Sequence, residues 1–109
     1  MLLASVEVDV DARDQRGQTP MSLAAEGGHT DIVNLLLSRE ARPEFADFIK
    51  ATPLWYAAEG GHSAVLEMLV GLDGTDINVV AGRELGMEYT PLSLAAINGH
   101  DAIARLLLA

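Results

Sequence analysis

Apolar residues in this chain gather in three short runs with helical spacing. The runs are IVNLLL at 32–37, VLEMLV at 65–70 and IARLLL at 103–108. In the first run, the residues expected to form one apolar stripe of a helix are Ile32, Val33, Leu35 and Leu36. Polar stretches rich in charged and turn-forming residues separate the runs, at 10–18 and 43–51. The pattern predicts short amphipathic helices connected by projecting loops or hairpins.

A nearly identical phrase precedes each run. The phrases are TPMSLAAEGGH at 19–29, TPLWYAAEGGH at 52–62 and TPLSLAAINGH at 90–100. A threonine can cap a helix with its hydroxyl, and proline at the first helical position loses no hydrogen bond. The alanine pair lets another helix approach closely, and the glycine favours the left-handed geometry that ends a helix. Each phrase therefore predicts a first helix, and the run after it predicts a second, antiparallel one.

The helix pairs recur at intervals of 33 and 38 residues. Because no pair can bury its apolar face alone, neighbouring pairs must stack into a quasi-linear array. The pattern T-P-L-x-x-A-A-x-x-G-H-x-x-[IV]-V-x-L-L-L resembles the ankyrin repeat over essentially the whole chain. The resemblance implies an all-α fold, an ankyrin-repeat solenoid of stacked helix-turn-helix units with projecting β-hairpin or loop fingers.

The resemblance also divides the chain, which we expect to form one domain over 1–109. The predicted units are the end of a preceding repeat with the first finger at 1–11, repeats at 12–44 and 45–82, and a repeat at 83–109 that is truncated at its C-terminal end. Because the chain opens in the middle of a repeat, we expect further ankyrin repeats or other domains in the full-length protein.

The fingers depart from the family pattern at their tips. The family's glycine two residues before the threonine is present as Gly17 but is replaced by Lys50 and Glu88. We therefore expect altered tips in the second and third fingers. The second interval is also five residues longer than the first, so the third finger should be longer than its neighbours.

Composition narrows the class of protein. Half of the 109 residues are hydrophobic, which suits one domain with a continuous core. Without cysteine, the chain has no disulfide, no thiolate nucleophile and no cysteine-type zinc site. The apolar runs are far shorter than the roughly 18 residues of a membrane helix, so we expect no membrane span. The start of the chain does not read as a secretory signal, and we expect an intracellular protein, in the cytoplasm or the nucleus.

The net charge indicates which kinds of partner the chain binds. Sixteen acidic residues against seven basic ones give a formal net charge of −9. Such a surface repels phosphate backbones, which disfavours a role in nucleic-acid binding. The same charge favours, by electrostatic steering, a partner that carries a basic patch.

Three histidines repeat at His29, His62 and His100. Equivalent atoms of stacked repeats lie about 10 Å apart, whereas ligands of one zinc ion lie about 2.1 Å from it. The histidines cannot share a metal, and we expect each ring to fix the turn between its two helices by bonding backbone groups. Glycines interrupt both Glu-x-x-His pairs, and no nucleophile elbow or phosphate loop is present. We assign no catalytic, cofactor-binding or metal-binding residue and expect no enzyme activity.

The resemblance implies protein–protein interaction through the concave inner-helix face and the finger tips, without catalysis. The candidate contact residues are Gln15, Arg16, Gln18, Met21, Ser22, Phe48, Lys50, Trp55, Arg83, Glu84, Glu88 and Ser93, and the third finger is expected to contribute over the range 83–88. An alternative function is that of a structural spacer within a larger multidomain signalling protein. Such a spacer would contact nothing specific itself.

The aromatic residues either pack within the array or contact a partner. Tyr56 replaces a leucine of the other repeats, which favours a place in the core. Trp55 replaces a serine, and it is either an interface anchor or a residue that packs under a finger. Phe45 and Phe48 lie in the second finger, where packing of the finger onto the array is favoured over contact with a partner.

Overall fold

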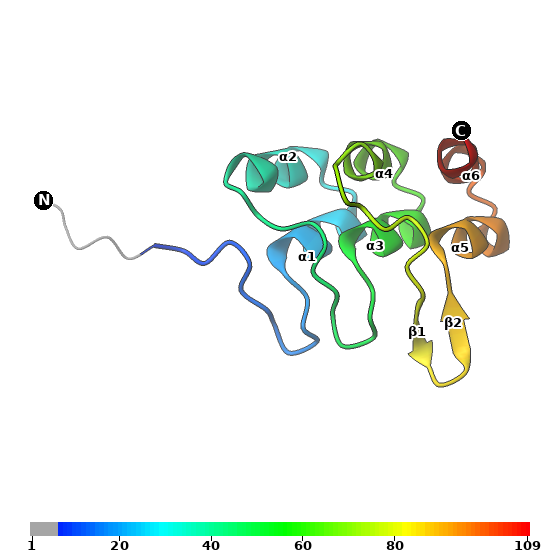
Figure 1. Cartoon of the computed structure of the whole chain (residues 1–109), viewed down its shortest axis with the longest axis horizontal. Coiled ribbons are helices and arrows are strands. Elements are labelled where there is room, and N and C mark those ends of the chain that lie inside the picture. The colour runs from blue at the N-terminus through cyan, green and yellow to red at the C-terminus, as the bar shows by residue number, and fades with distance from the viewer. Residues whose placement is uncertain (1–6) are drawn as a thin grey trace, which may run out of the picture.

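The computed structural model describes residues 7–109, which form six α-helices and one two-stranded hairpin (Figure 1). The elements are α1 (Pro20–Gly27), α2 (Thr30–Ser38), α3 (Pro53–Gly60), α4 (Ser63–Val70), β1 (Ala81–Glu84), β2 (Met87–Tyr89), α5 (Pro91–Asn98) and α6 (Asp101–Leu108). Figure 1 shows α1, α3 and α5, the inner helices, in one layer and α2, α4 and α6, the outer helices, in a second. The three fingers project from the inner layer. Stacked helix pairs with fingers are the architecture that the repeats predict; the end of a preceding repeat, predicted within 1–11, falls largely on residues 1–6, outside the described part of the chain.

Each inner helix begins and ends as its phrase predicts. The Thr19 hydroxyl accepts a hydrogen bond from the Ser22 amide at 3.3 Å, and proline occupies the first turn. At the other end, Gly28 has a φ of 72° and caps the helix with its amide. The same arrangement recurs in α3 and α5, so local capping sets the length of all three inner helices.

The core runs through the stack because each inner helix packs against the next. Helix α3 lies between α1 and α5, and all its residues from Pro53 to Ala58 are buried. Tyr56 is 4% exposed, which confirms its predicted place in the core. From the outer layer, Val33, Leu66 and Ile103 reach 0% exposure against the inner helices. No helix within residues 7–109 is long and apolar enough to span a bilayer.

Histidines join consecutive repeats. The Nε2 of His62 donates to the Glu26 carbonyl at 2.9 Å, and the Nε2 of His100 donates to the Glu59 carbonyl at 3.0 Å. The predicted backbone-bonding role is confirmed for these two rings. The acceptor lies in the preceding repeat, so each ring fastens one layer to the next, whereas the sequence predicted a bond within the ring's own turn.

The first two fingers share one turn, which an aspartate organises. Asp14 Oδ1 accepts hydrogen bonds from the amides of residues 16 and 18, and Asp47 Oδ1 accepts from those of residues 49 and 51. Lys50 adopts a φ of 71°, close to the 79° of Gly17. The expectation of an altered second tip is therefore wrong, because Lys50 accepts the left-handed conformation that the aspartate-centred turn imposes.

The third finger differs from the first two, as expected. Strands β1 and β2 pair antiparallel, with Ala81 opposite Tyr89 and Glu84 opposite Met87. Gly86 supplies the positive φ of the tip, at 78°. The segment between α4 and α5, 71–90, is longer than the segment between α2 and α3, 39–52. The extra residues predicted from the repeat interval therefore build a hairpin.

Candidate functional site

The fingers and the inner helices meet in a hollowed corner. We call this surface the palm and define it by the finger residues 14–18, 47–51 and 81–89 with the adjoining side of α1, α3 and α5. A hollow of about 400 Å3 opens there and is lined by Arg16, Asp47, Phe48, Ile49, Tyr56 and Arg83. A second, of about 200 Å3, lies between α3 and the third finger. Arg83 borders both hollows and divides them.

Arg83 is held in place by contacts with helix α3. Its guanidinium forms a two-pronged ion pair with Glu59, with Nη2 2.9 Å from Oε1. The same group lies 5.5 Å from the ring centroid of Trp55 and 5.9 Å from that of Tyr56. The hydrogen bond to Glu59 raises the pKa of Arg83 above its usual value. Since half of this side chain remains exposed, a partner in the palm can reach it.

Asp47 lines the larger hollow, but its carboxylate is fully engaged in hydrogen bonds within the protein. It is buried, with its Oδ1 bonded to two finger amides and its Oδ2 accepting the Tyr56 hydroxyl. Burial first, and the bond to Asp47 second, raise the pKa of the Tyr56 phenol. These two residues therefore tie the second finger to α3 and form the floor of the hollow.

Trp55 packs beneath the third finger. Its side chain is 1% exposed, and its indole Nε1 donates to the Tyr89 carbonyl at 2.9 Å. Of the two interpretations that the sequence leaves open, packing under a finger is the one that the structure shows. Its role is to hold the base of the hairpin against the inner helix.

Four predicted contact residues are not accessible in the described structure. Gln18, Met21, Ser22 and Trp55 are each 0–1% exposed. The Gln18 amide donates to the Ser22 hydroxyl, and Met21 belongs to the main core. The first turn of the inner helix thus points into the stack, and we remove these four residues from the candidate contact surface.

The other predicted residues lie at or near the surface. Ser93 is half-buried, and its hydroxyl completes a capping box with Thr90. The exposed members are Gln15, Arg16, Phe48, Lys50, Arg83, Glu84 and Glu88. All seven belong to fingers, so the fingers rather than the helices carry the candidate surface, and the role of these residues in binding stays a prediction.

Phe45 and Phe48 differ: Phe45 packs against neighbouring residues, whereas Phe48 is exposed. Phe45 is half-buried, and the guanidinium groups of Arg13 and Arg42 lie 5.0 and 5.7 Å from its ring centroid. Phe48 touches the first finger at Gly17 but keeps 73% of its surface exposed. The predicted finger packing therefore holds for Phe45, whereas Phe48 remains open to a partner.

Two exposed apolar residues lie within the range 83–88 of the third finger, where the sequence predicts contacts with a partner. Leu85 is fully exposed at the hairpin tip, and Met87 is 50% exposed. Their signal in the sequence is an apolar pair around Gly86, within a stretch of acidic residues. Together with Phe48, they give the palm an apolar rim.

Charges are distributed unequally over the fingers. Arg16 and Lys50, on the first two fingers, form no side-chain hydrogen bond or ion pair with residues 7–109. Glu84 and Glu88, on the third finger, are likewise exposed and unpaired within that range. The palm therefore carries available cations toward its first repeat and available carboxylates toward its last.

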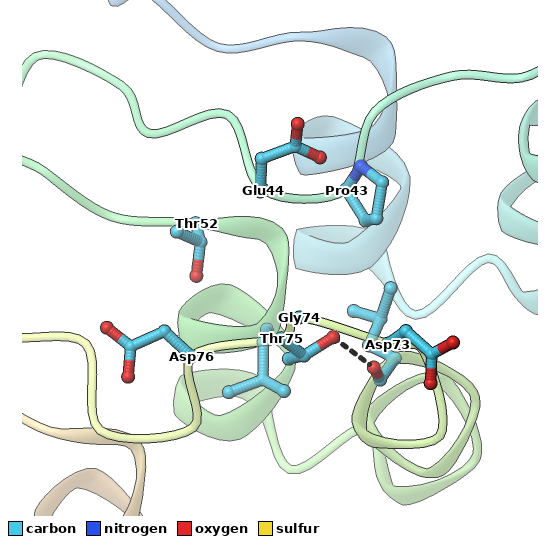
Figure 2. Close-up of a pocket in the computed structure, with 9 residues that line it drawn as sticks. Pro43, Glu44, Thr52, Asp73, Gly74, Thr75 and Asp76 are labelled. Atoms are coloured by element: carbon cyan, nitrogen blue, oxygen red, sulfur yellow. Dashed lines mark hydrogen bonds between the residues drawn. The ribbon is translucent and has the colours of Figure 1, made fainter.

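A separate hollow of about 360 Å3 lies between the loops that follow α2 and α4. Figure 2 shows that Glu44, Asp73 and Asp76 line it and that their carboxylates point in different directions. The Thr75 hydroxyl, also in its wall, donates to the Leu69 carbonyl and caps α4. Because the carboxylates do not converge, we assign no ligand to this hollow.

Comparison with known proteins agrees with the fold. A family model described as ankyrin repeats in three copies matches residues 1–81, and a single ankyrin repeat model matches residues 87–109. The chain therefore belongs to the ankyrin-repeat family, whose members are general protein–protein interaction modules.

Relatives among characterised proteins are similar over a shorter stretch. The human ankyrin repeat domain-containing protein 63 is 48% identical over 46 residues, which cover 42% of this chain and 12% of that protein. The mouse protein of the same name is 46% identical over 46 residues, with the same coverage. The match thus spans about an eighth of the length of these relatives.

Proposed function

We propose that this chain binds another protein through its finger tips and the palm, by surface complementarity and without covalent chemistry. The observation that carries the proposal is the apolar rim of the palm. Phe48, Leu85 and Met87 are 73%, 105% and 50% exposed, although each belongs to an ordered finger. Exposed apolar groups around a hollow are typical of protein interaction sites, where aromatic residues and methionine are enriched.

The rigidity of the fingers supports this function. The Phe48 amide donates to the Arg16 carbonyl at 3.1 Å, and the Gly82 amide donates to the Ile49 carbonyl at 3.4 Å, so neighbouring fingers are bonded to one another. Trp55 fixes the third finger from below. A partner that binds here orders few additional groups, which lowers the entropic cost of association.

The distribution of charge over the fingers indicates which charges the partner's surface carries. The net charge of −9 steers basic surfaces toward the chain, and Glu84 and Glu88 offer carboxylates on the third finger. Arg16 and Lys50 offer cations at the other end of the palm. We therefore propose a partner whose basic patch meets the third finger and whose acidic groups meet the first two.

Affinity capture with matched variants tests the proposal. The wild-type chain is compared with a Phe48→Ala, Leu85→Ala double variant by quantitative mass spectrometry of the captured proteins. Glu67→Gln, on the exposed side of outer helix α4, serves as the control. We expect a protein that the wild type and the control capture equally and that the double variant loses.

Charge variants then test the partner's chemistry. Glu84→Gln with Glu88→Gln should weaken the captured complex and reduce its dependence on salt, whereas Glu67→Gln should change neither. If the double apolar variant captures the same proteins in the same amounts as the wild type, binding does not use the palm.

A further inference from the structure

The larger hollow of the palm, of about 400 Å3, has walls suited to one flat apolar side chain. Phe48 and Ile49 line it from the second finger, and Tyr56 lines it from α3. Arg16 and Arg83 complete the lining from the first and third fingers, so the hollow lies inside the array rather than at one of its ends. Its volume is at the lower end of the range of about 300–1,000 Å3 that is typical of ligand pockets, which suits a single large side chain.

Phe48 differs from the other aromatic residues near the hollow in having no cation over its ring. The guanidinium of Arg83 lies 5.5 Å from the ring centroid of Trp55 and 5.9 Å from that of Tyr56, and Phe45 has two guanidinium groups over its ring. Among residues 7–109, no guanidinium lies over Phe48, which is 73% exposed. Its ring is therefore available to stack with an aromatic group that enters the hollow.

Arg16 supplies the positive charge that is available in this hollow. The charge of Arg83, the other arginine in the lining, is paired with Glu59. Arg16 is exposed and forms no ion pair within the described part of the chain. A free guanidinium can donate two parallel hydrogen bonds to a carboxylate, and its face can lie against an aromatic ring.

The charges of the first two fingers favour an anion beside the hollow. Within the finger ranges 14–18 and 47–51, the carboxylates are Asp14 and Asp47, and each accepts two hydrogen bonds from finger amides. Asp47 is also buried and accepts the hydroxyl of Tyr56. The cations of the same ranges, Arg16 and Lys50, are exposed and have no ion pair within residues 7–109. The matching occupant therefore combines an aromatic ring with a carboxylate.

We propose that this hollow receives an aromatic side chain of the partner protein, a tryptophan or phenylalanine that has an aspartate or glutamate beside it. The ring stacks on Phe48 above the floor formed by Tyr56. The carboxylate pairs with Arg16, and Lys50 adds a second positive charge nearby. The inference rests on the proposed function, because it assigns one residue pair of the partner to a place in the palm. Such an aromatic anchor in a pocket supplies much of the binding energy of many interfaces.

NMR titration of the full chain with three small molecules tests the proposal. Indole-3-acetate combines the ring with the carboxylate, indole-3-acetamide keeps the ring without the charge, and cyclohexylacetate keeps the charge without an aromatic ring. We expect indole-3-acetate to shift the amide signals of Arg16, Phe48 and Ile49. It should bind about two- to fivefold more tightly than either of the other two molecules, which is the typical effect of one exposed ion pair or cation–π contact.

Variants assign the two preferences to two residues. Arg16→Gln should remove most of the difference between indole-3-acetate and indole-3-acetamide, because the carboxylate loses its partner. Phe48→Leu should remove most of the difference between indole-3-acetate and cyclohexylacetate, because the stacking ring is lost. Arg39→Gln removes the same charge from the exposed end of α2, outside the palm, and should leave all three affinities unchanged. The amide spectrum of each variant shows whether its fold is retained.

Capture of the partner separates this inference from the proposed function. If indole-3-acetate shifts no palm amide, or binds no more tightly than the other two molecules, the inference is wrong, even where the Phe48→Ala, Leu85→Ala double variant still loses its partner. The proposed function would then stand without it. If indole-3-acetate binds as expected but the double variant captures the same proteins as the wild type, both are wrong, because the hollow then receives no side chain of a partner.

Discussion

Trp55 in α3 donates a hydrogen bond from its indole Nε1 to the main-chain carbonyl of Tyr89, 2.9 Å away at the end of β2. The two residues are far apart in the sequence, and their contact joins the second repeat to the finger of the third. At the same repeat position, Ser22 and Ser93 are too short for such a bond. The longest finger of the molecule is therefore fastened by a residue that the other repeats lack.

Replacement of Trp55 by Phe should destabilise the protein and loosen the third finger. The part-buried Tyr89 carbonyl loses this donor, and the loss of one such hydrogen bond costs about 0.5–1.5 kcal/mol. The smaller ring also leaves a gap in the cluster formed with Ala81 and Leu94. Urea unfolding measures the loss, and hydrogen exchange should show faster exchange in 81–89. Gln15→Ala, on an exposed finger, should stay within about 0.5 kcal/mol.

Two leucines of the outer helices differ in how deeply they are buried. Leu69 is 1% exposed, and Leu69→Ala should lower the free energy of unfolding by about 2–5 kcal/mol. Leu35 is 54% exposed, so Leu35→Ala should lower it by about 1 kcal/mol or less. Chemical denaturation at low protein concentration compares the two. Equal losses would contradict the assignment of inside and outside.

Lys50 and Gly17 provide a test of backbone strain. Both residues have a positive φ, 71° and 79°, at equivalent positions of the second and first fingers. Lys50→Gly should raise the free energy of unfolding by about 0.5–1 kcal/mol, because glycine adopts this conformation without a steric penalty.

The reverse change at the first finger should destabilise it. A Cβ at Gly17 would lie 2.8 Å from Cδ1 of Phe48 and would also sit at a positive φ. Gly17→Ala should therefore lower the free energy of unfolding by about 1 kcal/mol or more. Thermal or urea unfolding measures both variants, and a loss of stability in Lys50→Gly would show that the lysine side chain matters more than its backbone.

Tyr56 should make stability depend on alkaline pH. Burial and the bond to Asp47 raise its pKa in the folded state above the ordinary value of about 10. The folded state then holds this proton more tightly than the unfolded state, so the stabilisation is complete below about pH 10. It is lost as the pH rises from there through the folded pKa. Unfolding measured against pH should show this decline, and Tyr56→Phe should remove the part due to this residue.

Local signals made much of the fold predictable. Thr19 and Pro20 start a helix, and Gly28 ends it, through bonds that reach only a few residues along the chain. Repetition of these signals predicts the stacked array. The longer third finger follows from the repeat interval alone.

The candidate site was predicted less completely. The expected residues of the first helical turn, Met21 and Ser22, are buried, because neighbouring layers decide which side of that turn is covered. The range 83–88 was predicted as a contact region, but the exposure of its apolar residues Leu85 and Met87 depends on the course of the backbone at the hairpin tip. The division of the palm by Arg83 depends on Glu59, 24 residues earlier in the chain.

The sequence by itself determined the repeated helix pairs, their order and the presence of fingers, because capping and helical periodicity act between near neighbours. The tertiary structure alone decided which copy of a repeated residue is buried, as the contrast of Leu23 with Leu94 shows. It also decided that Trp55 supports a finger and that Lys50 takes a conformation suited to glycine. These outcomes depend on what the next layer places against each residue, and that contact exists only once the repeats have stacked.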